Sequence, residues 1–189
     1  MFLLHKPSEK EINDFLAAQS DLPFSYQDVG ATKGHNAPDG YPINHYRKEL
    51  GNGEQTYKKA IKAIESWKMY DLDWTQLCPS NAPIKIGEVV ATLINHLGFW
   101  SLNPCRIIYL IDEENDKFNR YGFGFVPLDD KLFFTLFRMC RKSSKPKPVA
   151  IKFVVYFINQ INDTARIQRP KTEVIYQSCD NFAYLDGCV

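Results

Sequence analysis

The most site-like group of side chains in this sequence is the run Asn44-His45-Tyr46-Arg47. If this stretch is a β-strand, His45 and Arg47 lie on the same face, because side chains two residues apart point the same way. An imidazole beside a guanidinium is suited to binding an anionic head group. A polar strand face with a locally hydrogen-bonded histidine gives the same pattern, and the sequence leaves both interpretations open.

A second group of candidates surrounds a predicted hairpin. His96, Trp100, Asn103 and Arg106 cluster at this hairpin, and Tyr109 follows on the same stretch. These side chains are suited to lining the mouth of a cavity, whereas in the alternative the tryptophan packs in the core and the polar groups satisfy the turn. Cys105 with His96 as its base would make a nucleophile, but no nearby charge marks its thiolate as stabilised, so a buried, inert thiol is favoured.

Two further large rings, Trp67 and Trp74, are candidates for contact with a ligand, and core packing is again the alternative. No H-E-x-x-H motif, cysteine pair or carboxylate cluster in the sequence suggests a metal site, so we predict neither a metal nor a cofactor. No residue is assigned a catalytic role. The run Gly51-Asn52-Gly53 lacks the lysine and the spacing of a phosphate-binding loop and is interpreted as a turn.

Two helices are predicted to frame these candidates. Ser8 and Glu11 form an S-x-x-E capping box, which predicts a helix from about Ser8 to Gln19. The second helix begins near Glu54, an acid well placed at a helix N-terminus. Its apolar stripe has helical spacing and consists of Tyr57, Ala60, Ile61, Ile64 and Trp67.

The remaining patterns predict strands. We expect strands at 41–50, at 69–77 with Leu72 and Trp74 pointing inward, and at 119–126, where Gly122 and Gly124 leave room on one face. Residues 87–112 are the densest strand-forming stretch, with breaks predicted at Gly98 and again at Asn103-Pro104. Residues 27–40 are interpreted as a long loop.

Composition bounds the class of protein. The chain has 189 residues, which makes one domain the default, and 44% of them are hydrophobic. A net charge of +1 argues against a general nucleic-acid binder. Five cysteines, an odd number, favour reduced thiols and a cytoplasmic location. No apolar run approaches the roughly 20 residues of a membrane span, and no signal peptide is recognised.

Several short blocks occur together in a fixed order: KPS at 6–8, LPFSY at 22–26, VGAT at 29–32, NHYR at 44–47, LGNG at 50–53, WKMYDL at 67–72, LCP at 77–79, HLGFWSLN at 96–103 and CRI at 105–107. In these blocks, residues 1–125 resemble the DUF1990 (UPF0548) family. The resemblance implies an α+β fold similar to the START and major birch pollen allergen proteins. In that helix-grip fold a curved antiparallel sheet wraps a long C-terminal helix and encloses a hydrophobic cavity. The resemblance implies no particular reaction.

The last third of the chain departs from this pattern. The family's Gly-His and Gly-Glu-Glu blocks are missing after Phe125, and the formal charge changes from −3 over residues 1–125 to +4 over 126–189. We therefore interpret 126–189 as a divergent tail with an incomplete or atypical closing helix, or as the product of a frameshift. The frameshift hypothesis fails if neither other reading frame beyond codon 125 encodes those blocks. Residues 149–161 are β-prone and are expected to cover the hairpin where the closing helix is absent, while 138–148 are a basic, Pro-containing loop.

The sequence is compatible with three functions. The first is the binding of a small hydrophobic or amphipathic ligand in a START-like cavity. The second is an enzyme in the same cavity with His45, Arg47 or His96 as its polar groups. The third is a truncated family member without function. The predicted ligand-binding residues are His45, Arg47, Trp67, Trp74, His96, Trp100, Arg106 and Tyr109.

Overall fold

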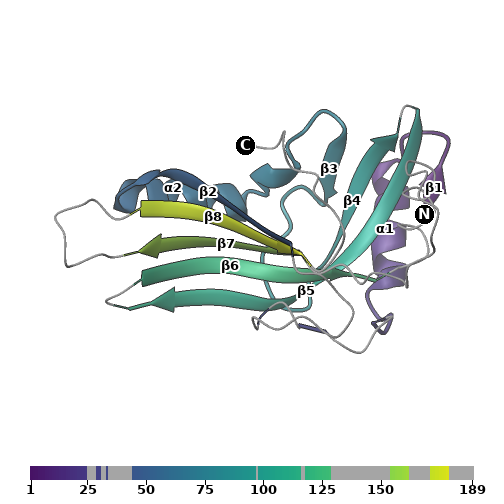
Figure 1. Cartoon of the computed structure of the whole chain (residues 1–189). Coiled ribbons are helices and arrows are strands. Elements are labelled where there is room, and N and C mark those ends of the chain that lie inside the picture. Colours follow the sequence, from purple (N-terminus) through teal and green to yellow (C-terminus); the bar gives the residue numbers. More distant parts are fainter. Residues whose placement is uncertain are drawn as a thin grey trace, which may run out of the picture.

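The structure is a computed structural model of the chain. It describes residues 1–24, 29–30, 33, 44–96, 98–115, 118–128, 154–161 and 171–178, with 44–48 and the last two ranges described as backbone only. This part of the chain is α+β, with a curled antiparallel sheet of eight strands and two α-helices (Figure 1). The fold class predicted from the sequence is confirmed at this level.

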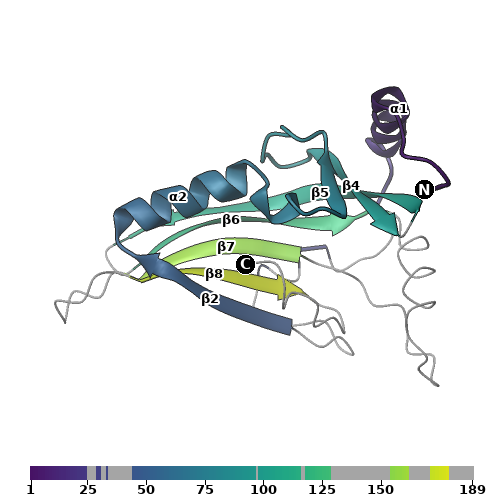
Figure 2. The same ribbon diagram turned by 90° about the horizontal axis from the view of Figure 1, so that it is seen from above.

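The elements follow one another along the chain as β1 (Phe2–Leu3), α1 (Glu9–Gln19), β2 (Asn44–Asn52), α2 (Glu54–Glu65), the 3-10 turn η2 (Lys68–Tyr70), β3 (Thr75–Cys78), β4 (Val89–His96), β5 (Phe99–Glu114), β6 (Phe118–Pro127), β7 (Val154–Ile161) and β8 (Lys171–Ser178). In space the strand order is β2-β8-β7-β6-β5-β4-β3, and β1 pairs with β5. Strand β2 therefore lies beside β8, although the two strands are far apart in the sequence (Figure 2).

Both predicted helices form where their patterns placed them. Ser8 caps α1 through the reciprocal box, since its hydroxyl accepts from the backbone of Glu11 and its backbone donates to the Glu11 carboxylate at 2.8 Å. Helix α2 follows Gly53, whose φ of +87° favours glycine. With 11 and 12 residues, neither helix approaches the length of a membrane span, and the described residues contain no helix long and apolar enough to be one.

The two helices pack against opposite faces of the sheet. Ala91, Leu93 and Leu102 are buried against the apolar side of α1. Val90 and Cys105, which alternate with them along β4 and β5, belong instead to the cluster around α2. Buried side chains therefore occupy consecutive positions along parts of β4 and β5, in place of the alternation of buried and exposed residues seen in a sheet with one solvated face.

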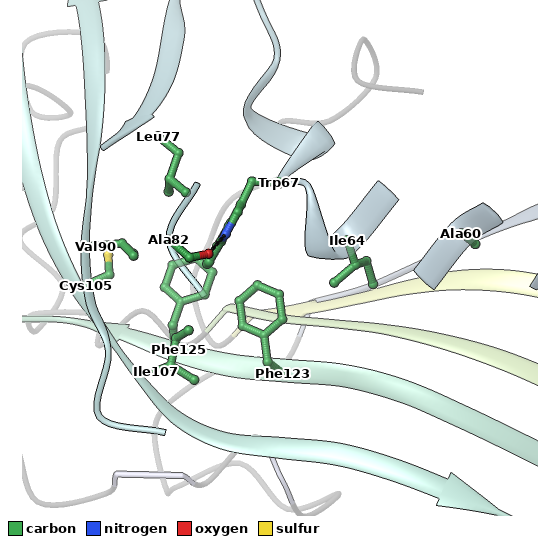
Figure 3. Close-up of a cluster of buried hydrophobic side chains, with 10 residues drawn as sticks. All are labelled: Ala60, Ile64, Trp67, Leu77, Ala82, Val90, Cys105, Ile107, Phe123 and Phe125. Atoms are coloured by element: carbon green, nitrogen blue, oxygen red, sulfur yellow. Dashed lines mark hydrogen bonds between the residues drawn. The ribbon is translucent and has the colours of Figure 1, made fainter. Parts of the chain in front are cut away.

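The larger cluster joins α2 to the middle of the sheet (Figure 3). Ile64 is 5% exposed, and the side chains of Ile107 and Phe123 beneath it are fully buried. Burying each of these side chains contributes about 1.5–3 kcal/mol relative to leaving it exposed. This packing helps to fix α2 against the sheet, where the helix lies near β6 and β7.

A β-bulge in β5 reverses which side chains face α2. Ile107 pairs with Phe125, whereas Tyr109 pairs with Gly124, so the register shifts by one residue between them. Tyr109 therefore points away from α2, and its ring lies directly over Gly124. The predicted room on one face of β6 is confirmed at Gly124, where the Tyr109 ring occupies it.

The predicted strand at 69–77 is wrong in its first half. The chain makes the 3-10 turn η2 and then a tight turn in which the N–H of Thr75 donates to Leu72 O at 3.2 Å. Asp73 and Trp74 form the centre of this turn, and Trp74 is 49% exposed instead of pointing inward. Only Thr75–Cys78 forms a strand.

The predicted break at Asn103-Pro104 is also wrong, because β5 runs through it, while the break at Gly98 is confirmed as the hairpin turn. Pro104 is tolerated because of where its nitrogen points. Its carbonyl accepts from Leu128 on the edge of β5 away from β4, and the backbone of Leu102 bonds Met1 on that same edge. The missing N–H of Pro104 therefore falls at the junction between β1 and β6, where it interrupts no pairing with β4.

Residues 154–161 do not cover the hairpin as expected. They lie within the sheet as β7, paired with β6 along one side and β8 along the other. The strand tendency of this segment is confirmed, but its predicted place over the face of the sheet is not, because α1 and α2 already occupy the two faces. The predicted basic loop 138–148 and most of the predicted loop 27–40 lie outside the described residues.

We expect Gly124→Ala to lower the free energy of unfolding by about 1–3 kcal/mol through overpacking. A methyl group at this position would lie 2.6 Å from Cε1 of Tyr109, and Tyr109 is only 5% exposed, so its ring has little room to move. Urea denaturation measures the change. In a Tyr109→Leu background the substitution should cost clearly less. Equal costs in the two backgrounds would show that the ring does not restrict position 124.

Candidate functional site

All three tryptophans of the chain line one surface groove of about 450 Å³ beside β3, the last strand in the sheet order. We call it the tryptophan groove. Its aromatic and aliphatic lining consists of Trp67, Tyr70, Leu72, Trp74, Leu77 and Trp100, and its polar lining of Lys6, Ser66, Lys68, Asp71, Asp73, Thr75, Gln76 and Ser80. The structure thus brings together Trp67, Trp74 and Trp100, three of the predicted ligand-binding residues.

Trp67 forms the rigid floor of the groove. It is 2% exposed, and its indole N–H donates to Ala82 O at 2.8 Å (Figure 3). Its ring meets Phe123 edge-on with 4.9 Å between centroids, an arrangement that aromatic pairs prefer. The hydrogen bond and the ring contact together hold the indole in one orientation, so this part of the groove is preformed.

Trp74 and Trp100 are more accessible than Trp67. Trp74 projects from the turn before β3, and half of its side chain is exposed. Trp100 is half-buried on β5, with the Lys6 ammonium 5.5 Å from its ring centroid, a cation–π contact. Trp74 is therefore the most exposed of the three tryptophans that line the groove.

The charged groups of the groove balance one another. Lys68 and Asp71 form an exposed ion pair at 2.9 Å. Lys6 and Asp73 are one further charge of each sign among the lining residues, which leaves the groove neutral overall. We did not anticipate these residues from the sequence. The sequence did hold two signals. Lys6, Lys68 and Asp71 lie in the family-like blocks KPS and WKMYDL, and the run Asp71-Leu72-Asp73 is typical of a turn.

His96 lies outside this groove, in a polar cluster on β4 and β5. Its Nε2 lies 2.9 Å from the hydroxyl of Ser101, which is 1% exposed and also accepts from the Asn103 amide at 3.0 Å. Asn103 donates in addition to Thr92 O at 3.2 Å. Partial burial lowers the pKa of His96, which keeps its imidazole neutral near pH 7.

Cys105 is remote from His96, the residue that would have to act as its base if the thiol were a nucleophile. His96 pairs with Phe99, whereas Cys105 lies six residues further along β5, a separation of about 20 Å along the strand. Both Cys105 and Cys78 are buried, and burial raises the pKa of the Cys78 thiol. These positions agree with the interpretation of Cys105 as an inert thiol. In the described residues no group of three or more potential ligands is placed to hold a metal ion.

Arg106 is engaged with the end of α1. Its guanidinium donates to the carbonyl oxygens of Gln19, Ser20 and Leu22 at 3.2, 2.7 and 3.0 Å and lies 5.1 Å from the Phe24 ring centroid. A cation at this point satisfies carbonyls that a helix C-terminus leaves unpaired. This contact connects α1 to β5, and Arg106 is not part of the tryptophan groove.

Of the other predicted ligand-binding residues, Tyr109 also lies apart from the groove. Tyr109 is buried over Gly124, with the Lys33 ammonium 5.8 Å from its ring centroid. On β2, the backbones of His45 and Arg47 pair with Gln177 and Ile175 of β8. Their side chains lie outside the described part of the chain, so an anion site formed by these two residues stays a prediction.

The lowered pKa of His96 predicts an acid-side loss of stability. The unfolded chain takes up a proton at a histidine near pH 6.5, whereas folded His96 resists protonation. Its contribution to stability is therefore present above pH 6.5 and is lost as the pH falls below it. In urea titrations at pH 7.5 and 5.5, His96→Gln should lose less stability than the wild type, because an amide keeps the Ser101 contact without titrating.

The comparison between wild type and variant cancels the other histidines, which are the same in both proteins. Hydrogen bonds from the Ser8 backbone and hydroxyl lower the pKa of Glu11 to about 2. Glu11 therefore changes the pH dependence of stability only below about pH 4.3, outside the range from pH 5.5 to 7.5 used here. An equal loss of stability in His96→Gln and wild type would contradict the expected role of His96.

Comparison with known proteins places the chain in a recognised sequence family. A family model described as a domain of unknown function, DUF1990, matches residues 25–132. The UPF0548 protein of Dictyostelium discoideum is 30% identical over 140 residues, 69% of this chain and 65% of that protein. The UPF0548 protein of Deinococcus radiodurans is 29% identical over 143 residues, 70% of each chain.

The UPF0548 protein At2g17695 of Arabidopsis thaliana is 28% identical over 87 residues, 46% of this chain and 42% of that protein. The chain therefore matches less than two thirds of the length of the Dictyostelium and Arabidopsis relatives. The three tryptophans lie inside the stretch that the family model matches, and Lys6 lies before it. Since the model spans residues 25–132 of 189, more than half of the sequence, the chain belongs to the DUF1990 (UPF0548) family.

Proposed function

We propose that this protein binds a small amphipathic molecule in the tryptophan groove. The observation that carries the proposal is the convergence of all three tryptophans on one groove of about 450 Å³. Ligand sites commonly have volumes of about 300–1,000 Å³ and combine aromatic walls with a few polar groups. Because Trp67 is already fixed by Ala82 and Phe123, binding requires little ordering of the floor.

The proposed site differs from the cavity that the family resemblance implied. In a START-like protein the ligand lies between the sheet and a long helix. Here Ile64, Trp67 and Phe123 fill the space between α2 and the sheet. We infer a START-like arrangement from the curled antiparallel sheet and the helix on its face, and we place the ligand at the edge of that sheet.

The proposal predicts that Trp74→Ala weakens binding of the amphipathic aromatic probe 8-anilinonaphthalene-1-sulfonate by about tenfold or more. Tryptophan is among the side chains that most often carry binding energy, and Trp74 is the most exposed ring of the groove. Fluorescence titration measures the affinity. The control is Ile86→Ala, because Ile86 is 64% exposed and lies outside the groove, and it should bind as the wild type does. Equal affinities of wild type and Trp74→Ala would reject the groove as the binding site.

A hydrolase is a second candidate, favoured by the 2.9 Å contact between Ser101 and His96. In such a reaction Ser101 Oγ attacks an ester carbonyl while His96 Nε2 takes the hydroxyl proton and then gives it to the departing alcohol. Water afterwards cleaves the acyl group from Ser101, with His96 again as base. Because Ser101 is 1% exposed, substrate reaches it only if the surrounding side chains move.

This candidate predicts hydrolysis of p-nitrophenyl acetate that Ser101→Ala reduces by at least 100-fold, since the nucleophile is lost. Release of p-nitrophenol is followed by absorbance. Cys105→Ala should keep the activity and serves to exclude a reaction of the buried thiol. If Ser101→Ala hydrolyses the ester as fast as the wild type, the pair is a structural hydrogen bond only.

A further inference from the structure

We propose that the ligand of the tryptophan groove is a carbohydrate, an inference that rests on the function proposed above. The first reason is the composition of the lining, which has six aromatic or aliphatic and eight polar residues. A lipid chain in this groove would cover polar groups without replacing their hydrogen bonds to water, which is costly. A molecule with an apolar face and many hydroxyl groups matches both halves of the lining.

The balance of charge also points to a neutral ligand. Lys6 and Lys68 are matched by Asp71 and Asp73, and Lys68 is already paired with Asp71. A strongly anionic ligand would meet the two carboxylates, and a cationic one the two ammonium groups. Each repulsion between like charges is unfavourable and offsets the attraction to the opposite charges. A net charge on the ligand therefore adds little to its affinity for the groove.

The aromatic rings are poorly placed to enclose a cation. A cage for a quaternary ammonium needs several free ring faces around one point. The Lys6 ammonium is already placed against Trp100, and Trp67 is only 2% exposed. Trp74 alone offers a large free surface, with 49% of its side chain exposed. One flat, open indole is suited to stacking against the C–H face of a sugar ring.

Polar side chains beside Trp74 supply what the hydroxyl edge of a sugar requires. The Asp73 carboxylate accepts hydrogen bonds, and the Gln76 amide both donates and accepts. Gln76 is exposed and is held on β3, where it pairs with Leu93 of β4. A sugar hydroxyl is likewise both donor and acceptor, so each of these two lining groups can bond one.

The experiment screens the full chain on a microarray of natural mono- and oligosaccharides and measures each positive glycan by isothermal titration calorimetry. Dodecanoate, choline and the naphthalene probe are titrated in parallel. We expect at least one glycan to bind, with affinity lowered tenfold or more by Trp74→Ala. Gln76→Leu should lower it about two- to tenfold, the equivalent of one hydrogen bond. The control Ile86→Ala, which lies outside the groove, should change neither the glycan affinity nor the affinity for the naphthalene probe.

The outcomes separate this inference from the proposed function. If dodecanoate, choline or the naphthalene probe binds in a Trp74-dependent way and no glycan does, the carbohydrate assignment is wrong and the binding function stands. If no probe binds in a Trp74-dependent way, both proposals fail. Glycan binding that neither Trp74→Ala nor Gln76→Leu weakens would place the sugar elsewhere and overturn the assignment.

Discussion

Most of the described structure depends on the packing and hydrogen bonding of the buried Trp67 indole. Its N–H bonds Ala82 O at 2.8 Å, and its ring rests on Phe123, so it connects the end of α2, the loop before β4 and the centre of the sheet. Trp67 adopts a left-handed backbone conformation, with φ of 54°, which costs a non-glycine residue about 1–2 kcal/mol. Burial of the ring and its hydrogen bond offset this cost.

That backbone reversal has a direct consequence for the surface. The chain leaves α2 at Trp67, makes the turn η2 and a second tight turn, and only then enters β3. After Trp67, Met69 and Tyr70 still pack against the core, whereas Trp74 in the second turn is 49% exposed and lines the groove. The Thr75 N–H and hydroxyl bond Leu72 O and Tyr70 O, which also protects the outer edge of the last strand. One buried side chain thus organises both a core and a candidate site.

Local patterns predicted the parts of the fold whose causes are local. The box at Ser8 and Glu11 fixed the start of α1, and the stripe ending at Trp67 predicted α2, because caps and helical spacing act within a few residues. The errors at Trp74 and Pro104 have a different origin. Strand formation at these positions depends on which neighbour lies alongside, a property that alternation along the chain does not contain.

The candidate site shows the same division. The sequence by itself determined the two helices and the supply of large rings at positions 67, 74 and 100, and its resemblance to a family implied the antiparallel α+β class. Only the tertiary structure decided that these rings share one groove, and that Arg106 caps α1 while Tyr109 covers Gly124. The physical reason is that pairing of β1, β3, β4 and β5 brings together side chains that are distant in the chain. Their meeting depends on strand register and on the bulge at Ile107, which no short sequence window specifies.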